Sequence, residues 1–231
     1  MNGSHMRKAS LYDYRAVIFD LDGTLYYQKP FRLRMLFYLI GYAIRHPFRV
    51  RDLFLIKRYR EIRENWPKYE QSVSFPIGYD MEHRQYAYVA SEKHVSQEHV
   101  KHTIQFFMME APLKLLPAYK DRMLSDFIDT LHQKNITTVV YSDYPTEDKL
   151  RALSIKADVS FTSADSEIGC LKPDPKGLKV ILRTLNLNPD EVIMIGDRYE
   201  KDGLAAVSNK TDYIIVSASK KRRAKLIHLF T

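Results

Sequence analysis

The fold of this 231-residue chain is decided by one short stretch, Arg15-Ala16-Val17-Ile18-Phe19-Asp20-Leu21-Asp22-Gly23-Thr24. Its first half is rich in β-branched and aromatic residues, which predicts a buried strand over residues 15–20. Two aspartates and a glycine follow at once, and a glycine in such a place indicates a turn. The sequence therefore predicts a strand that delivers two carboxylates to one edge of a sheet.

The same kind of strand returns after Pro117, each time next to a helical stretch. Further strands are predicted over 136–142, 159–162, 192–197 and 213–216, and helices over 121–134, 146–153, 175–185 and 201–207. Strands that alternate with helices of this length imply parallel β-α-β units with helices on both faces of the sheet. The expected class is α/β, with a Rossmann-like three-layer core and a mainly parallel sheet.

Between the first strand and Pro117 the pattern is helical, with apolar residues at three- and four-residue steps and arginines between them. A stretch with Pro and Gly over residues 66–79 interrupts the helices, and Ser96 is a candidate start for a new one. We therefore expect an α/β core of residues 7–27 and 117–231, with a helical domain inserted over residues 28–116. Residues 1–6 resemble the remnant of an expression tag and are left out of this fold.

The net charge of +8, from 36 Lys and Arg against 28 Asp and Glu, is unevenly distributed. Residues 29–63 hold ten cations and two anions, and the tail 220–225 adds five cations. The rest of the chain is therefore acidic, and we expect no nucleic-acid partner. The basic segment is interpreted as the solvated face of amphipathic helices, with steering of anionic substrates or contact with lipid headgroups as alternatives. The basic tail is interpreted as a frayed, solvated terminus.

Composition also limits the location of the protein. A single cysteine excludes an internal disulfide framework and suits a reducing cytosol, so a cytoplasmic protein is expected. The longest apolar run, residues 35–44, is far shorter than the roughly 20 residues of a membrane span. We expect this run to form a helix buried in the inserted domain, and the alternatives are that it lines an apolar substrate pocket or forms a dimer surface. We expect no transmembrane segment and no peripheral membrane contact. The sequence sets no oligomeric state.

Polar residues stand at the carboxyl ends of the predicted strands, where open α/β sheets bind ligands. Asp20 and Asp22 follow the first strand, and the other candidates are Ser142, Lys172, Asp197 and Asp202. Four carboxylates in one pocket repel each other unless a cation neutralises them, and oxygen-only ligands suit Mg²⁺. A carboxylate can attack phosphorus, aided by a dication and a lysine, while a second carboxyl group moves protons.

These residues, in order and spacing, resemble the four motifs of the haloacid dehalogenase (HAD) superfamily. Residues 20–25, Asp-Leu-Asp-Gly-Thr-Leu, resemble the first motif, and Ser142 after an apolar strand resembles the second. Lys172-Pro173 resembles the third motif and residues 196–202 resemble the fourth. The match covers residues 15–27 and about 117–217. The insertion corresponds only in position, as a helical cap of the capped phosphatase type.

The resemblance implies a role for each matched residue. Asp20 would be the nucleophile and a Mg²⁺ ligand, and Asp22 the general acid and base with its backbone carbonyl on the metal. Ser142 would bind the phosphoryl group, and Lys172 would restrain Asp20 and neutralise charge. The remaining metal ligands would be Asp197 and Asp202, the latter directly or through water.

Some of these residues have simpler interpretations. Ser142 could be a helix cap or turn residue, and Asp202 a helix-start residue favoured by the helix dipole. Thr24 and Asp143 complete the expected phosphate site. Asp143 stands where many relatives carry a neutral residue, so it could also face solvent or bind a cationic substrate group.

The expected function is a Mg²⁺-dependent phosphatase acting on a small phosphorylated metabolite through an aspartyl-phosphate. Asp22 favours phosphotransfer, since the dehalogenases of the superfamily typically lack this second acid. A phosphomutase resembling β-phosphoglucomutase is the alternative enzyme. A third hypothesis is a module that binds an anionic polymer or membrane surface and has only vestigial catalysis.

Overall fold

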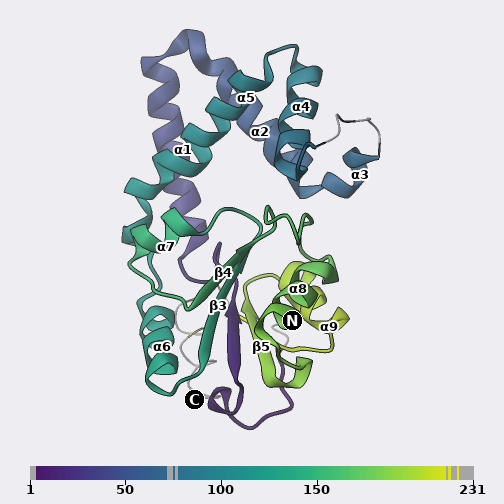
Figure 1. Cartoon of the computed structure of the whole chain (residues 1–231). Coiled ribbons are helices and arrows are strands. Elements are labelled where there is room, and N and C mark those ends of the chain that lie inside the picture. Colours follow the sequence, from purple (N-terminus) through teal and green to yellow (C-terminus); the bar gives the residue numbers. More distant parts are fainter. Residues whose placement is uncertain (1–3, 72–74, 76–77, 217, 220–222, 224–231) are drawn as a thin grey trace. The chain divides into compact units, whose positions relative to one another are not determined.

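The computed structural model describes residues 4–71, 75, 78–216, 218–219 and 223 of the chain. Its chain divides into two compact units (Figure 1). One unit, the core, consists of Met1–Phe31 with Leu116–Thr231, and the other, the helical unit, consists of Arg32–Leu115.

The core is built on one sheet of six strands in the order β1-β6-β5-β2-β3-β4. The strands are β1 (Ser4–His5), β2 (Ala16–Phe19), β3 (Thr137–Ser142), β4 (Val159–Thr162), β5 (Val192–Gly196) and β6 (Asp212–Ile215). Strands β2 to β6 are mutually parallel, and among the described strands only β1 pairs antiparallel, with β6. The α/β class with a mainly parallel sheet is therefore confirmed.

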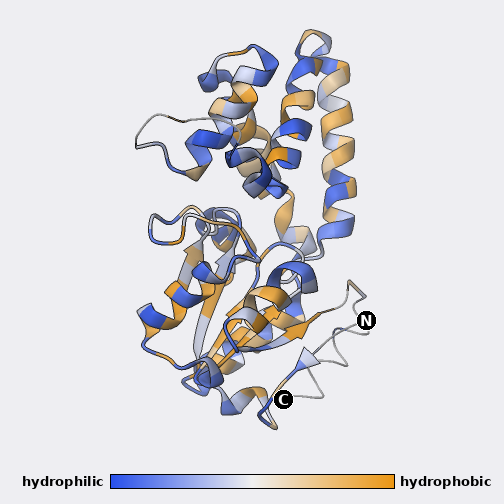
Figure 2. Ribbon diagram, turned by 90° about the vertical axis from the view of Figure 1, so that its right-hand side faces the viewer, coloured by the Kyte–Doolittle hydropathy of each residue, from blue (hydrophilic) through white to orange (hydrophobic). Residues whose placement is uncertain are grey.

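Strand β2 lies at the centre of the sheet, between β3 and β5. All four of its residues are buried, because helices cover both faces of the sheet. Ile18 belongs to the cluster of apolar residues under α8 (Pro175–Leu185) and α9 (Leu204–Ser208). Phe19 points to the opposite face and packs edge-on against Phe127 of α6 (Arg122–Gln133). Within the core, Figure 2 shows apolar residues, in orange, along the strands of the sheet.

The other core segments are short and serve as connections. They are the turns η1 (Leu11–Asp13), η5 (Leu116–Tyr119), η6 (Pro189–Glu191) and η7 (Tyr199–Gly203), together with the helix α7 (Glu147–Leu153). The helix predicted over 201–207 is confirmed as a helical stretch, which consists of the π-helix η7 followed by the α-helix α9. The segment η7 holds Asp202 in a buried position directly after β5.

The helical unit contains α2 (Val50–Glu64), α3 (Trp66–Glu70), α4 (Met81–Lys93) and α5 (Gln97–Ile104), with the turns η2 (Pro47–Arg49), η3 (Gln105–Glu110) and η4 (Ala111–Lys114). The helix α1 (Gln28–Arg45) leads into it from the core. Tyr59, Ile62 and Val89 are fully buried where α2 packs on α4. Ser96 accepts a hydrogen bond from the backbone N–H of His99 at 3.1 Å and caps α5, as its position predicts.

The prediction for the apolar run 35–44 is wrong: it was expected to be buried, but much of it is exposed on α1, including Phe37 and Ile44. The interpretation of residues 1–6 as the remnant of a tag stays a prediction, although Ser4 and His5 pair with Ile214 and Tyr213 at the edge of the sheet. Among the described helices, none combines the length and the apolar composition that a membrane span requires.

Asp212, the first residue of β6, fastens the N-terminal segment to the sheet. Its buried carboxylate accepts hydrogen bonds from the backbone N–H and the Nε of Arg7, both at 2.7 Å, and from the hydroxyl of Tyr14. Burial by itself would raise the pKa of Asp212, but the bonds from Tyr14 and Arg7 lower it below its ordinary value.

We expect Asp212→Asn to lower the free energy of unfolding by about 2 kcal/mol at neutral pH, because hydrogen bonds to a charged acceptor are lost. A lowered folded-state pKa stabilises the fold above the ordinary pKa and ceases to do so as the pH falls through the lowered value. The difference between wild type and variant should therefore narrow below about pH 4. Urea denaturation at a series of pH values measures this, and a difference that grows on acidification contradicts it.

Candidate active site

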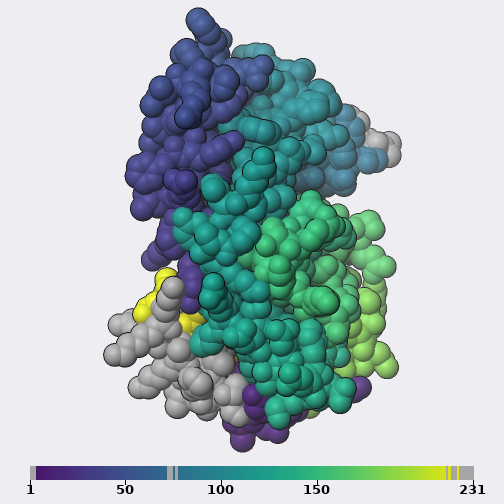
Figure 3. Space-filling view, turned by 90° about the vertical axis from the view of Figure 1, so that its left-hand side faces the viewer, coloured from purple at the N-terminus to yellow at the C-terminus, as the bar shows by residue number. Residues whose placement is uncertain are grey.

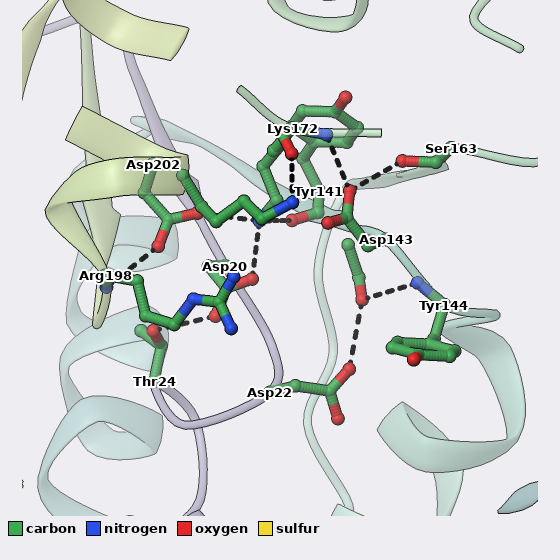
Figure 4. A network of polar contacts seen from close by, with 12 residues as sticks. Asp20, Asp22, Thr24, Tyr141, Asp143, Tyr144, Ser163, Lys172, Arg198 and Asp202 are labelled. Atoms are coloured by element: carbon green, nitrogen blue, oxygen red, sulfur yellow. Dashed lines mark hydrogen bonds and ion pairs between the residues drawn. The ribbon is translucent and has the colours of Figure 1, made fainter. Parts of the chain in front are cut away.

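Three neighbouring strands bring the predicted site residues together at one edge of the sheet (Figure 4). Asp20 follows β2, Ser142 ends β3 and Asp197 follows β5. The backbone N–H of Asp20 donates to the carbonyl of Ile195 at 2.8 Å, which extends the β2–β5 pairing to the site. Because all three strands are parallel, their carboxyl ends lie side by side.

Lys172 is the centre of the site. Its buried ammonium group donates to Asp20 Oδ1 at 2.6 Å, to Asp202 Oδ1 at 2.7 Å and to the carbonyl of Tyr141 at 3.3 Å. Thr24 donates its hydroxyl to the other oxygen of Asp20 at 2.9 Å. Both oxygens of Asp20 are therefore held, one by a cation and one by a neutral donor.

Asp20, Asp197 and Asp202 form a cluster that fits a divalent cation. Each offers a carboxylate oxygen, and these oxygens lie within 4.8 Å of one another. Burial and the nearby charge of Asp202 raise the pKa of Asp197 to about 6. When all three carboxylates are ionised, the ammonium group of Lys172 offsets one of their charges, and two negative charges remain at this largely buried site. An oxygen-only donor set with this charge is typical of a Mg²⁺ site.

The same cluster perturbs Asp20 itself. Burial raises its pKa well above the ordinary value, against the effect of Lys172, and the neighbouring carboxylates raise it further. The ionised form of Asp20 is therefore disfavoured unless further positive charge is present, which a bound dication would supply.

Two glycines provide the space for these carboxylates. A Cβ atom on Gly23, whose φ is +105°, would lie 2.1 Å from Asp197 Oδ2. A Cβ atom on Gly196 would lie 2.3 Å from the carboxyl group of Asp202. The backbone can approach the acidic cluster this closely only because both residues lack a side chain.

Asp22 has its own set of partners. Lys149 Nζ donates to both carboxylate oxygens at 2.6 and 2.8 Å, Ser142 Oγ donates at 3.2 Å, and the hydroxyl of Tyr26 also donates. Burial would raise the pKa of Asp22, but the charge and hydrogen bonds of Lys149, aided by Tyr26 and Ser142, lower it. The two aspartates of the first motif therefore have opposite pKa shifts two residues apart.

Asp143 was expected to complete the phosphate site, and in the structure its carboxylate binds the loop that carries Lys172. Its Oδ1 accepts hydrogen bonds from the backbone N–H of Lys172 at 2.9 Å and from the hydroxyl of Ser163 at 2.8 Å. These contacts hold the loop that carries Lys172 next to β3. The expected contact of Asp143 with substrate stays a prediction.

The sequence analysis did not identify three residues that contact the first motif, which are Tyr26, Lys149 and Arg223. Lys149 lies in the first turn of α7, where a lysine on a helix gives no signal of its own. Arg223 belongs to the tail that was expected to be a solvated terminus, but it is buried, so this expectation is wrong at that position; Lys220–Arg222 and the residues after Arg223 lie outside the described part of the chain.

Arg223 binds the backbone of the first-motif loop. It donates to the carbonyls of Gly23 and Thr24 and to Asp121 Oδ2, the last at 2.8 Å. Asp121 also caps α6 by accepting from the backbone N–H of Leu124 at 3.1 Å. A buried ion pair therefore ties the tail, the α6 N-terminus and the acidic loop together.

We expect Arg223→Gln to lower the free energy of unfolding by about 3 kcal/mol, because it leaves the buried Asp121 carboxylate without its cation. The double variant with Asp121→Asn should lose less, since the amide removes that charge and still offers an oxygen to cap α6. Urea denaturation of the two variants and of wild type measures both values. A double variant that is less stable than Arg223→Gln contradicts the ion-pair interpretation.

Comparison with known proteins agrees with this geometry. The family model "haloacid dehalogenase-like hydrolase" matches residues 14–208. No curated protein matches the chain.

Solved structures with the same fold have low sequence identity to this chain. A 2-haloacid dehalogenase from Pseudomonas syringae is 17% identical, with a TM-score of 0.61 over 88% of this chain and 86% of that one. The putative HAD-hydrolase YfnB from Bacillus subtilis, bound to magnesium, is 16% identical, with a TM-score of 0.61 over 94% and 98%. A putative beta-phosphoglucomutase from Thermotoga maritima is 17% identical, with a TM-score of 0.51 over 94% and 92%.

At these identities the structures show a common fold, whereas the family model spans most of the chain and includes the residues of all four motifs. The chain therefore belongs to the haloacid dehalogenase-like hydrolases and is an enzyme.

Proposed function

We propose that this enzyme is a Mg²⁺-dependent phosphatase that hydrolyses a small phosphorylated metabolite, in the cytoplasm, through an aspartyl-phosphate on Asp20. The observation that carries the proposal is the pair of aspartates in the first motif with separate environments. Asp20 lies in the acidic cluster beside Lys172, whereas Asp22 lies outside it with Lys149 and Ser142. A nucleophile and a proton carrier need this kind of separation.

In the first half-reaction, an oxygen of Asp20 forms a bond to phosphorus and the bond between phosphorus and the leaving oxygen breaks. Asp22 donates a proton to that oxygen. Asp22 is ionised in the arrangement described above, so it must first take up a proton. An incoming phosphate dianion favours this, because it competes for the ammonium of Lys149 and its charge opposes that of Asp22.

In the second half-reaction, Asp22 takes a proton from water, whose oxygen attacks phosphorus and displaces Asp20. Lys172 keeps Asp20 oriented and offsets its negative charge in both steps. Asp20, Asp197 and Asp202 would hold Mg²⁺, which would offset charge on the phosphoryl oxygens. Ser142 and Thr24 supply hydroxyl groups at the same edge of the sheet.

The presence of Asp22 supports phosphotransfer over dehalogenation, because the attack of an aspartate on carbon that carries a halogen requires no acid for the leaving halide. A screen of the purified enzyme against phosphorylated metabolites, with released inorganic phosphate as the readout, tests the substrate class. Phosphate release without a sugar bisphosphate supports a phosphatase, and a strict bisphosphate requirement with isomerised sugar phosphate as product supports a mutase.

We expect Asp20→Asn to reduce kcat for p-nitrophenyl phosphate with Mg²⁺ by at least about 1,000-fold, because an amide cannot act as the nucleophile. The matched control is Asp129→Asn, an exposed aspartate of α6 in the same unit, which should keep wild-type activity. Full activity of Asp20→Asn would rule out the covalent mechanism.

We expect Asp22→Asn to affect the two half-reactions unequally. p-Nitrophenolate leaves readily without a proton, so Asp20 should still be phosphorylated, whereas hydrolysis of the aspartyl-phosphate loses its base and slows by about 100-fold or more. Stopped-flow absorbance should therefore show a burst of about one p-nitrophenolate per enzyme followed by slow turnover. Slow turnover without a burst would place the role of Asp22 before the covalent step.

A further inference from the structure

One face of α1 exposes a continuous row of large apolar side chains. Leu33, Phe37, Ile40 and Ile44 follow one another at steps of four, three and four residues, which places them on one side of the helix. Phe37 is 58% exposed and Ile44 is 76% exposed. Figure 3 shows these purple to indigo segments on the surface of the helical unit. Away from this row, α1 contacts η3, where the ring centroids of Tyr42 and Phe107 lie 4.8 Å apart.

The apolar surface continues past the end of the helix. Phe48, in the turn η2, is 97% exposed, and Phe54 of α2 is also exposed. Both residues line an open cavity of about 1220 Å³ in the helical unit, together with Arg49 and Arg51. A patch of this extent is more than the scattered apolar residues of an ordinary protein surface.

Cations outnumber carboxylates around this apolar patch, although Asp52 and Glu110 also line the cavity. Between Lys29 and Arg51 there is no aspartate or glutamate, and the cations there are Lys29, Arg32, Arg34, Arg45, Arg49 and Arg51. Arg32 and Arg34 lie about 100° to either side of Leu33 around the helix axis. Among the described residues, no carboxylate pairs with Arg32, Arg34, Arg49 or Arg51.

The apolar side chains and the cations together indicate what kind of partner fits this patch. A second copy of the chain, joined across a twofold axis, would place the same cations opposite one another with no acidic residue between them. A bilayer with anionic lipids complements both features, because apolar side chains enter the boundary between headgroups and acyl chains while the arginines remain at the phosphates.

We propose that this patch, formed by α1 and η2, docks the enzyme on the surface of an anionic lipid bilayer. The proposal replaces the sequence-based expectation that the run 35–44 is buried and that peripheral membrane contact is absent. The helix is too short and too charged to span the bilayer, so it lies in the plane of the interface. Docking does not depend on the proposed phosphatase activity, because none of the patch residues belongs to the acidic site.

Flotation of the full chain with vesicles tests the proposal. We expect binding to vesicles of phosphatidylcholine with about 30% phosphatidylglycerol, and binding at least about tenfold weaker to phosphatidylcholine alone or at ~0.5 M NaCl. The variants Phe37→Glu and Ile44→Glu should lose binding by about tenfold or more and keep wild-type turnover of p-nitrophenyl phosphate. The matched control Val207→Glu changes an apolar residue that is 48% exposed on α9, and it should bind as wild type does.

A second variant reports insertion directly. Ile44→Trp should show a blue-shifted emission with anionic vesicles, and Val207→Trp should show none. Equal binding to neutral and anionic vesicles would overturn the role of the arginines. Absence of vesicle binding, with a dimer by light scattering that Ile44→Glu converts to a monomer, would overturn the proposal in favour of a second copy.

Discussion

The rest of the site depends on the ammonium group of Lys172, which lies between the carboxylates of Asp20 and Asp202. Without that cation, the carboxylates of the buried acidic cluster would repel one another strongly. Several features of the fold keep the cation in place. Asp143 holds its backbone N–H, the carbonyl of Tyr141 accepts from its ammonium group, and the parallel strands bring those partners together. The carboxylates at this edge of the sheet therefore carry more negative charge than Lys172 offsets, and a dication could supply the missing positive charge.

The proposed reaction makes two different demands on the first motif. Asp20 would attack as an anion, and Asp22 would gain and lose a proton. The chain separates them by direction: Asp20 follows the line of β2 into the acidic cluster, whereas Asp22 turns outward to Lys149 and Ser142. The positive φ of Gly23 lets the loop turn tightly beside Asp197, and Arg223 binds the carbonyls that the turn exposes.

The helical unit has a different physical character from the core. Its interior is held by α2, α4 and α5, and α1 is left with an apolar face towards solvent and arginines along its borders. The basic excess of the chain is therefore concentrated beside exposed apolar side chains, where it suits an anionic surface. The acidic cluster at the candidate site is a separate, local feature of the core. The net charge of +8 describes neither unit by itself.

The sequence by itself determined strands β2 to β6 and the polar residues at their carboxyl ends, because these follow from local apolar runs and from the turn residues next to them. Only the tertiary structure decided which distant side chains meet them. Lys149 reaches Asp22 across 127 positions, and Arg223 reaches Thr24 across 199, contacts that no local pattern encodes. The exposure of α1 was likewise decided by packing, since an apolar run looks the same in sequence whether or not other helices cover it.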